Sequence, residues 1–255
     1  MTTYDTSART DDWSDFRIIA HRGASAVAPE NTLAAIARAA DLGARSVELD
    51  VMLSADCVPV IIHDTDLART TNGTGPVAAL PHESLARLDA GSWFGETFAG
   101  EKIPSLADAI TLVLKCDLAL NLEIKPSPGE DSATASRAIE LLAETWPHAT
   151  TLVLSSASIE ALAVARDAAP QWRRGLIANI PPTSWPEVLA DLGCASLHCA
   201  ASTATPSLIE AVHAAGYRLL AYTVNRPAIA ATLFKNGADG IFTDDPAAMI
   251  AEFPA

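Results

Sequence analysis

Two carboxylates stand two residues apart in an otherwise apolar stretch, and this spacing is a first sign of chemistry. Glu48 and Asp50 alternate with apolar residues in the sequence S-V-E-L-D-V-M-L. On a β-strand, side chains two residues apart point to the same side, with their Cα atoms about 7 Å apart. Two carboxylates on one buried strand repel each other and resist desolvation, and a bound divalent cation would relieve both costs. The alternative is an edge strand whose polar face lies in water.

Other residues that could bind anions or move protons follow short apolar runs. His21 and Arg22 follow I-I-A, and His63 follows V-P-V-I-I, which the turn S-A-D connects to the carboxylate stretch. In the sequence N-L-E-I-K, Glu123 and Lys125 share one side of an expected strand. Two further candidates stand at the ends of later apolar runs, and they are His198 and Tyr222.

The elements that would position these residues repeat a theme of one strand followed by one helix. Counting from residue 18 gives eight such units in about 235 residues, and this pattern predicts an α/β fold, the (β/α)8 TIM barrel. The expected strands are 18–20, 46–53, 119–124, 151–154, 175–178, 195–197, 218–224 and 240–242. Helix start signals precede several helical patterns, and they are Ser156, Ser184, Thr205-Pro206 and Asp245-Pro246.

One irregular stretch interrupts the alternation after the second barrel strand. It runs from about residue 64 to 105 and predicts a small insertion in a barrel domain of residues 17–255, while residues 1–16 read as a polar arm. A long irregular excursion in a compact domain usually has a function. Its aromatic residues Trp93, Phe94 and Phe98 favour an ordered flap. Phe94 is a candidate for direct substrate contact, and the alternative is packing of the insertion onto the domain.

The barrel prediction brings the chemical residues together, because the C-terminal ends of the strands form the face that carries active sites. Glu48, Asp50 and Glu123 would then supply three carboxylates to one place. Such a hard oxygen site suits Mg²⁺ or Ca²⁺, whereas zinc prefers histidine and cysteine ligands. For Glu123 alone, an ion pair with Lys125 is the alternative.

The basic residues expected at the same rim suit a phosphate and proton transfer. Arg22 can hold a phosphate through two hydrogen bonds, and Lys125 can add a point charge. His21 and His63 have ordinary pKa values near neutrality, which suits a general acid and a general base at pH 7. For His198, a role in substrate binding and a role in packing are equally good interpretations.

Composition excludes several classes of partner. The formal net charge is −14, from 17 basic and 31 acidic residues, and this argues against nucleic acids and anionic membranes. No apolar run approaches the roughly 20 residues of a membrane span. The first seventeen residues lack the features of a secretory signal. Four cysteines without C-x-x-C spacing are expected to be buried free thiols in a reducing cytoplasm, and they are Cys57, Cys116, Cys194 and Cys199.

Several motifs together resemble those of the glycerophosphodiester phosphodiesterase family, of the bacterial cytoplasmic type. They are H-R-G-A-S-x-x-x-P-E-N-T, E-L-D, H-D, S-W-F…F-x-G-E-K-I-P-S-L, N-L-E-I-K, Y-T-V-N and G-A-D-G-I-F-T-D, and they run from about residue 18 to the C-terminus. The resemblance implies a barrel that hydrolyses deacylated phospholipids to sn-glycerol 3-phosphate and an alcohol. It also implies a divalent metal on Glu48, Asp50 and Glu123, and the catalytic pair His21 and His63.

The sequence therefore predicts a cytoplasmic, metal-dependent hydrolase of small glycerophosphodiesters such as glycerophosphocholine and glycerophosphoethanolamine. Arg22, Lys125, His198, Phe94 and Tyr222 are the candidate substrate contacts. Two alternatives remain, a phospholipase D-like hydrolase of lysophospholipids or sphingomyelin, and a non-catalytic barrel that binds a phosphate or a polyol. The alcohol, the choice between Mg²⁺ and Ca²⁺, the nucleophile (water or the glycerol 2-hydroxyl), the acid among the histidines and homo-oligomerisation stay open.

Overall fold

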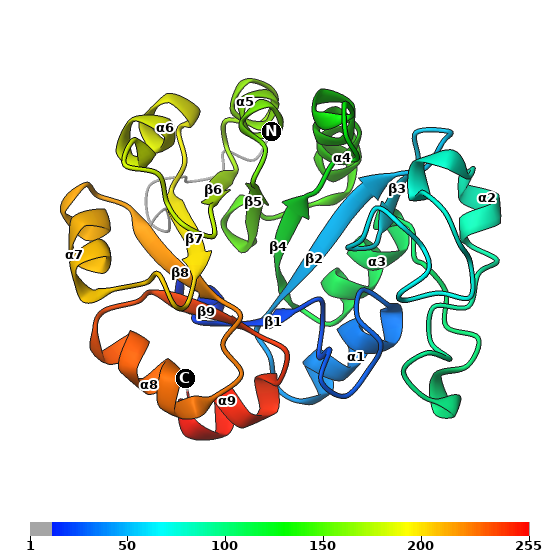
Figure 1. Cartoon of the computed structure of the whole chain (residues 1–255), viewed down its shortest axis with the longest axis horizontal. Coiled ribbons are helices and arrows are strands. Elements are labelled where there is room, and N and C mark those ends of the chain that lie inside the picture. The colour runs from blue at the N-terminus through cyan, green and yellow to red at the C-terminus, as the bar shows by residue number, and fades with distance from the viewer. Residues whose placement is uncertain (1–11, 255) are drawn as a thin grey trace, which may run out of the picture.

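Eight parallel strands form a closed ring in the computed structural model, which describes residues 12–254. Around the ring the order is β1-β9-β8-β7-β6-β5-β4-β2, and pairing of β1 with β2 closes it. Figure 1 shows the helices outside this ring. The predicted (β/α)8 barrel is confirmed. Its strands are β1 (Ile18–His21), β2 (Ser46–Leu53), β4 (Ala119–Ile124), β5 (Leu152–Ser156), β6 (Arg173–Ile177), β7 (Ser196–Ala200), β8 (Arg218–Tyr222) and β9 (Gly240–Thr243).

One helix follows each barrel strand, and side-chain caps fix where several of them begin. Thr205 and Asp245 accept hydrogen bonds from the first turns of their helices, as predicted. Ser156 does not cap: its hydroxyl bonds the carbonyl of Ile124 in the neighbouring strand, and Ser158 caps instead. The helices are α1 (Leu33–Asp41), α3 (Leu106–Lys115), α4 (Asp131–Thr145), α5 (Ile159–Ala168), α6 (Trp185–Leu192), α7 (Pro206–Ala214), α8 (Pro227–Lys235) and α9 (Pro246–Glu252).

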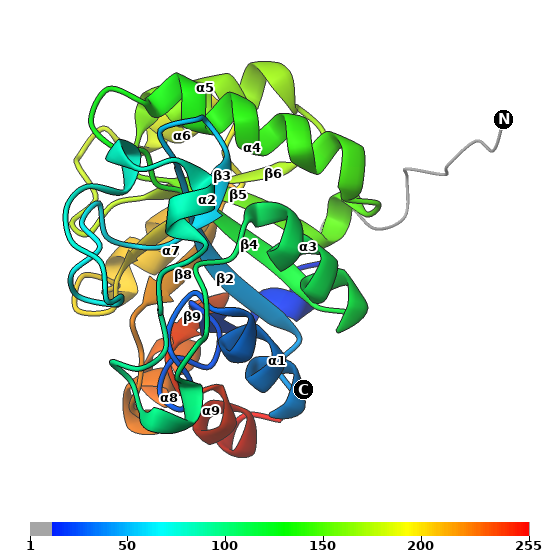
Figure 2. The same cartoon turned by 90° about the vertical axis from the view of Figure 1, so that its right-hand side faces the viewer.

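The insertion between β2 and α3 is ordered and has its own small apolar core. It begins with β3 (Pro59–Ile61), which pairs antiparallel with β2, and continues through η2 (Val77–Ala79), α2 (His82–Leu85) and η3 (Glu96–Phe98). Figure 2 shows this segment lying beside β2 and α1. Its core residues are Met52, Val60, Ile62, Leu67, Val77, Leu85, Ala90 and Ile103.

The four cysteines form no disulfide, but they are not all buried. Cys194 and Cys199 lie in the core, as expected. Cys57 is exposed, because it stands in the tight turn between β2 and β3 with a positive φ of 59°. Within residues 12–254, no helix combines the length and the apolar character needed to span a membrane.

Phe16 closes the N-terminal end of the barrel. Residues 1–11 of the predicted polar arm lie outside the described residues, and the remainder contains the short 3₁₀ helix η1 (Ser14–Phe16). Phe16, expected within this arm, is instead buried and packs with Ile19 and Phe242 inside the barrel. Its carbonyl oxygen approaches the Cα atom of Gly240 so closely that a Cβ atom there would collide with it. The backbone of η1 is therefore packed directly against the start of β9.

We expect Gly240→Ala to destabilise the protein by about 1–3 kcal/mol, because overpacking forces backbone shifts. Gly95→Ala is the matched control, since a Cβ atom at Gly95 would meet no atom within 4 Å. Urea unfolding followed by circular dichroism measures both variants. Equal midpoints for the two variants would contradict the close packing described here.

Candidate active site

The C-terminal ends of the barrel strands surround a cavity of about 320 Å³. The structure brings most of the predicted site residues to its wall, namely His21, Arg22, Glu48, His63, Glu123, Lys125, His198 and Tyr222. Asp50 lies behind this wall and is only 1% exposed. Phe94 is not among the residues that line the cavity. Its ring packs edge-to-face against Trp93 and Phe98 within the insertion.

The three predicted metal ligands come together in the fold. Glu48, Asp50 and Glu123 each place a carboxylate oxygen within 4.8 Å of the others. Burial raises the pKa of Glu48 well above its ordinary value, and the charges of Asp50 and Glu123 raise it further. Burial, and then the charge of Asp50, raise the pKa of Glu123 to about 7. One buried oxygen of Glu48 has no hydrogen-bond partner among residues 12–254. An all-oxygen set with these properties fits a hard divalent cation such as Mg²⁺ or Ca²⁺.

The loop after β1 holds two of these carboxylates in place. The backbone N–H of Arg22 donates to Glu48 over 2.9 Å. The Asn31 side chain donates to Asp50 over 2.8 Å and accepts from the Asp50 backbone N–H. Both Arg22 and Asn31 adopt a left-handed backbone conformation, with φ of 57°. Asparagine and threonine are both common at helix N-caps, so residue type alone would allow either Asn31 or Thr32 to cap α1. The structure separates them, because Thr32 caps α1 and Asn31 orients a predicted metal ligand.

The Arg22 side chain is held among acidic groups. Its Nη1 donates to Glu30 over 2.8 Å, and its Nε lies 3.5 Å from Asp50. Burial acts to lower the pKa of the guanidinium, but Asp50 and Glu30 outweigh it and raise the pKa. The group therefore stays charged and faces the cavity, where an anion could displace or share its acidic contacts.

Each of the two predicted catalytic histidines binds a carboxylate through Nδ1. His21 Nδ1 lies 2.6 Å from Asp244, and His63 Nδ1 lies 2.5 Å from Asp64. Although burial works to raise it, the hydrogen bond from His21 lowers the pKa of Asp244 to about 2. An ionised carboxylate only accepts hydrogen bonds, so Nδ1 carries the proton in both rings. Nε2 of each ring is then the atom that can exchange a proton with a ligand.

The two histidines differ at Nε2. Lys125 Nζ contacts Nε2 of His63, and an ammonium group only donates, so this nitrogen is unprotonated. Burial also lowers the pKa of His63, which favours the neutral ring. His21 also lines the cavity, and no side chain of residues 12–254 donates a hydrogen bond to its Nε2.

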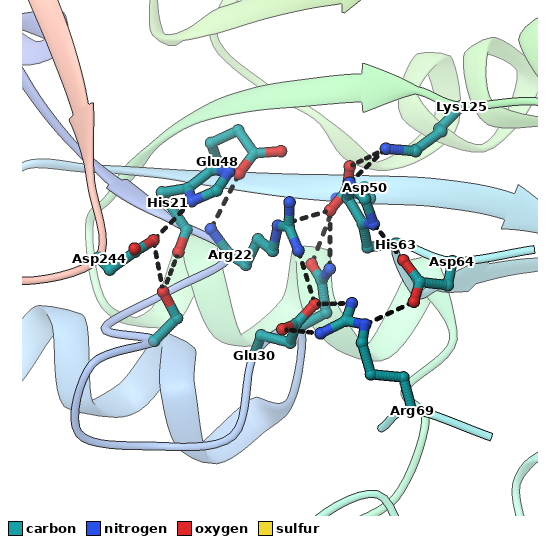
Figure 3. A network of polar contacts seen from close by, with 12 residues as sticks. His21, Arg22, Glu30, Glu48, Asp50, His63, Asp64, Arg69, Lys125 and Asp244 are labelled. Atoms are coloured by element: carbon teal, nitrogen blue, oxygen red, sulfur yellow. Dashed lines mark hydrogen bonds and ion pairs between the residues drawn. The ribbon is translucent and has the colours of Figure 1, made fainter. Parts of the chain in front are cut away.

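Behind His63, further charges extend the network shown in Figure 3. Asp64 accepts from Nε of Arg69, a residue of the insertion, over 2.5 Å. Arg69 also donates twice to Glu30, over 2.7 and 2.8 Å. Glu30 is the same carboxylate that binds Arg22. Sequence reasoning assigned no role to Arg69 or Glu30, because neither follows an apolar strand.

Polar side chains also form the floor of the cavity. His198 is buried, its Nε2 lies 2.9 Å from the Ser196 hydroxyl, and its Nδ1 has no hydrogen-bond partner among the described residues. Gly175 makes room for the ring, because a Cβ atom there would lie 2.5 Å from Nε2. Asn121 donates to the Ser155 hydroxyl, and its buried Oδ1 atom likewise lacks a partner in the described part of the chain. Both residues line the cavity, and each keeps one buried polar atom without a partner in residues 12–254.

Comparisons with known proteins agree on one family. Residues 21–248 match the model of the glycerophosphoryl diester phosphodiesterase family. The glycerophosphodiester phosphodiesterase of Caldanaerobacter subterraneus subsp. tengcongensis is 36% identical, over 91% of this chain and 96% of that protein. A phosphodiesterase from Oleispira antarctica, solved in complex with the product sn-glycerol-3-phosphate, is 39% identical with a TM-score of 0.93, over 95% of this chain and 99% of that one. A glycerophosphodiester phosphodiesterase from Agrobacterium tumefaciens str. C58 is 30% identical with a TM-score of 0.78, over 92% of this chain and 99% of that one.

We expect His198 to make the folded protein sensitive to acid. Burial lowers its pKa to about 3, whereas an unfolded histidine has a pKa of about 6.5. Below about pH 6.5 the unfolded chain gains a proton that the folded chain does not, so the free energy of unfolding falls as pH falls. Between about pH 6 and pH 4 this residue should contribute a slope of about 1.4 kcal/mol per pH unit.

Comparison of the wild type with His198→Gln isolates this slope. The difference between their unfolding free energies, from urea titrations at several pH values, should change in favour of the variant on acidification. A difference that stays constant from pH 7 to pH 4 would show that the imidazole is protonated in the folded protein.

Proposed function

Because the chain belongs to the glycerophosphoryl diester phosphodiesterase family, we propose that it hydrolyses glycerophosphodiesters to sn-glycerol 3-phosphate and an alcohol, with the help of a divalent metal ion. Glycerophosphocholine and glycerophosphoethanolamine are the proposed substrates. The observation that carries this proposal is the convergence on one cavity of Glu48 and Glu123, with Asp50 directly behind them, a half-buried arginine and two carboxylate-bound histidines. A phosphodiester needs charge neutralisation and two proton transfers, and this set of residues offers both.

Glu48, Asp50 and Glu123 are the residues that would hold the metal. When bound, such an ion would neutralise a phosphate oxygen and stabilise the charge that develops in the transition state. Arg22 and Lys125 would bind the remaining phosphate oxygens. Lys125 Nζ lies 3.8 Å from Asp50 and 3.9 Å from Glu123, so its charge already borders the proposed metal site.

We assign the general base to His63 and the general acid to His21. His63 has an unprotonated Nε2 and a lowered pKa, so it can take a proton from water or from the glycerol 2-hydroxyl. His21 binds Asp244 through Nδ1, which leaves its Nε2 as the atom that would donate a proton to the leaving alkoxide.

The glycerol end of the substrate is proposed to lie on the cavity floor. Asn121 Oδ1 can accept from a hydroxyl group, and His198 Nδ1 can donate or accept according to its tautomer. Tyr222 lines the same cavity and would contact the glycerol carbons. Phe94 remains a prediction for substrate contact, although its ring packs against Trp93 and Phe98 within the insertion.

The unpaired cysteines support a reducing compartment, and we propose the cytoplasm as the site of action. All four thiols are free, and two of them are buried in the core. Disulfides are typical of secreted domains and rare in the cytosol.

A second candidate function, hydrolysis of lysophospholipids, is favoured by the distribution of exposed apolar side chains. Among the described residues, the large exposed apolar side chains all lie in loops after strands, or in the first turns of helices that follow strands. These segments surround the catalytic face, where an acyl chain could pack against them. The five residues are Val27, Trp93, Ile159, Ile180 and Ile229.

A substrate panel with metal removal tests these proposals. We expect EDTA to abolish turnover of glycerophosphocholine, and Mg²⁺ or Ca²⁺ to restore it. Glu48→Gln, Asp50→Asn and Glu123→Gln should each weaken metal binding in calorimetry and keep the circular dichroism of the wild type. Glu83→Gln, on the exposed surface of α2, is the control. Undiminished turnover in EDTA would exclude the metal, and faster turnover of lysophosphatidylcholine than of glycerophosphocholine would support the second function.

Single alanine variants of the histidines test the acid–base assignment. Each should lose at least about a hundredfold in kcat on glycerophosphocholine. A nitrophenyl leaving group departs without a proton, so His21→Ala should regain near-normal rates on a nitrophenyl diester, whereas His63→Ala should stay slow. The reverse pattern would exchange the two roles. Equal slowness of both variants on the activated substrate would argue for a positioning role instead.

A further inference from the structure

The insertion supplies one side chain that connects the phosphate-binding and proton-transferring parts of the site. Arg69 lies at the lower edge of the network in Figure 3, between Glu30 and Asp64, and its side chain is partly exposed. Its three guanidinium nitrogens bind these two carboxylates, two to Glu30 and one to Asp64. Each carboxylate in turn binds one proposed active-site residue, Glu30 to Arg22 and Asp64 to His63.

We propose that Arg69 is a positioning residue that sets the orientation of Arg22 and His63 together. The proposal rests on the function proposed above, because it assigns Arg69 a role in that reaction. Arg69 does not touch the cavity, so it would act only through Glu30 and Asp64. Without Arg69, Glu30 and Asp64 would lose a shared counter-charge, and each would be free to adopt other rotamers.

The geometry distinguishes this contact from an ordinary surface ion pair. An exposed pair contributes little, because side-chain entropy and solvent screening offset the attraction. Here the arginine is 45% exposed, but the Glu30 side chain is only 12% exposed and receives two parallel hydrogen bonds. Bidentate arginine–carboxylate pairs fix orientation as well as distance. Glu30 and Asp64 also belong to different segments, the loop after β1 and the insertion, so Arg69 joins the two.

The two branches from Arg69 should have different kinetic signatures. The Glu30 branch holds Arg22, which would bind the phosphate in both the ground state and the transition state, so its loss should raise KM and lower kcat. The Asp64 branch holds His63, whose proton transfer belongs to the transition state, so its loss should lower kcat with little effect on KM. A residue that served stability alone would not produce this division.

Kinetics of single and double variants on glycerophosphocholine test the proposal. Arg69→Met should lower kcat/KM about 10- to 100-fold, with both parameters affected, because small displacements of positioned groups are costly. Arg69→Lys should recover only part of the loss, since an ammonium cannot bind both carboxylates in the geometry of the guanidinium fork. Glu30→Gln should act mainly on KM and Asp64→Asn mainly on kcat. Either change combined with Arg69→Met should cost less than the product of the two single effects.

Arg87→Met is the matched control, because Arg87 is an exposed arginine of the same insertion whose side chain pairs with Glu83. Its kcat and KM should stay within about twofold of the wild type. Thermal unfolding shows whether each variant is folded, and calorimetric binding of sn-glycerol 3-phosphate measures the Arg22 branch separately from turnover. If Arg69→Met does not fold, the proposal is tested by whether Glu30→Gln acts mainly on KM and Asp64→Asn mainly on kcat.

The proposal is overturned if folded Arg69→Met keeps wild-type kcat and KM, if Arg69→Lys restores full activity, or if Glu30→Gln and Asp64→Asn change the two parameters in the same way. Failure of the proposed function would look different, since the wild type itself would then not turn over glycerophosphocholine.

Discussion

Electrostatic repulsion among three closely spaced carboxylates, two of them buried, shapes the whole catalytic face. Asp50 and Glu123 are register partners on neighbouring strands, and Glu48 stands two residues before Asp50 on the same strand. Such a cluster is costly to desolvate, and the fold surrounds it with donors and cations. Arg22 reaches it from the loop after β1 and Lys125 from the end of β4. The cations that offset part of the acidic charge in this state are those that would bind a phosphate.

Polar residues outside the proposed reaction orient the groups proposed to take part in it. Asp244 and Asp64 each fix one histidine tautomer, and Asn31 fixes one carboxylate. Asp244 is itself held by Ser25 and by Asn225, which lies just after β8. His21 is therefore oriented by Asp244, just after β9, and His63 by Asp64, in the insertion. Precise placement of this kind is what proton transfer requires.

The barrel and the clustering of the proposed reacting residues could be predicted from the sequence, because both follow from the periodic pattern of apolar residues. Alternating apolar residues indicate β2, and the rule that strand ends share one face predicts that Glu48 and Glu123 lie together. The supporting residues were not readable in this way. Arg69 and Glu30 lie in irregular segments, and their contacts span 39 positions of sequence that no local pattern links. For Asn31, local propensity pointed to a helix cap, and the tertiary contact with Asp50 prevailed.

The strand register in the hairpin of β2 and β3 fixes the position of His63. β2 continues past its pairing with β1 and turns back at Ser54, and the register Val51 opposite Ile61 then fixes how far the chain has advanced when it reaches His63. Successive strand residues point to opposite sides, so gaining or losing one residue in the turn at 54–58 would invert the side on which the imidazole emerges. A change of two residues would keep the side but move the ring by about 7 Å. Among natural homologues, turn length at this point should thus be far less free than in the rest of the insertion.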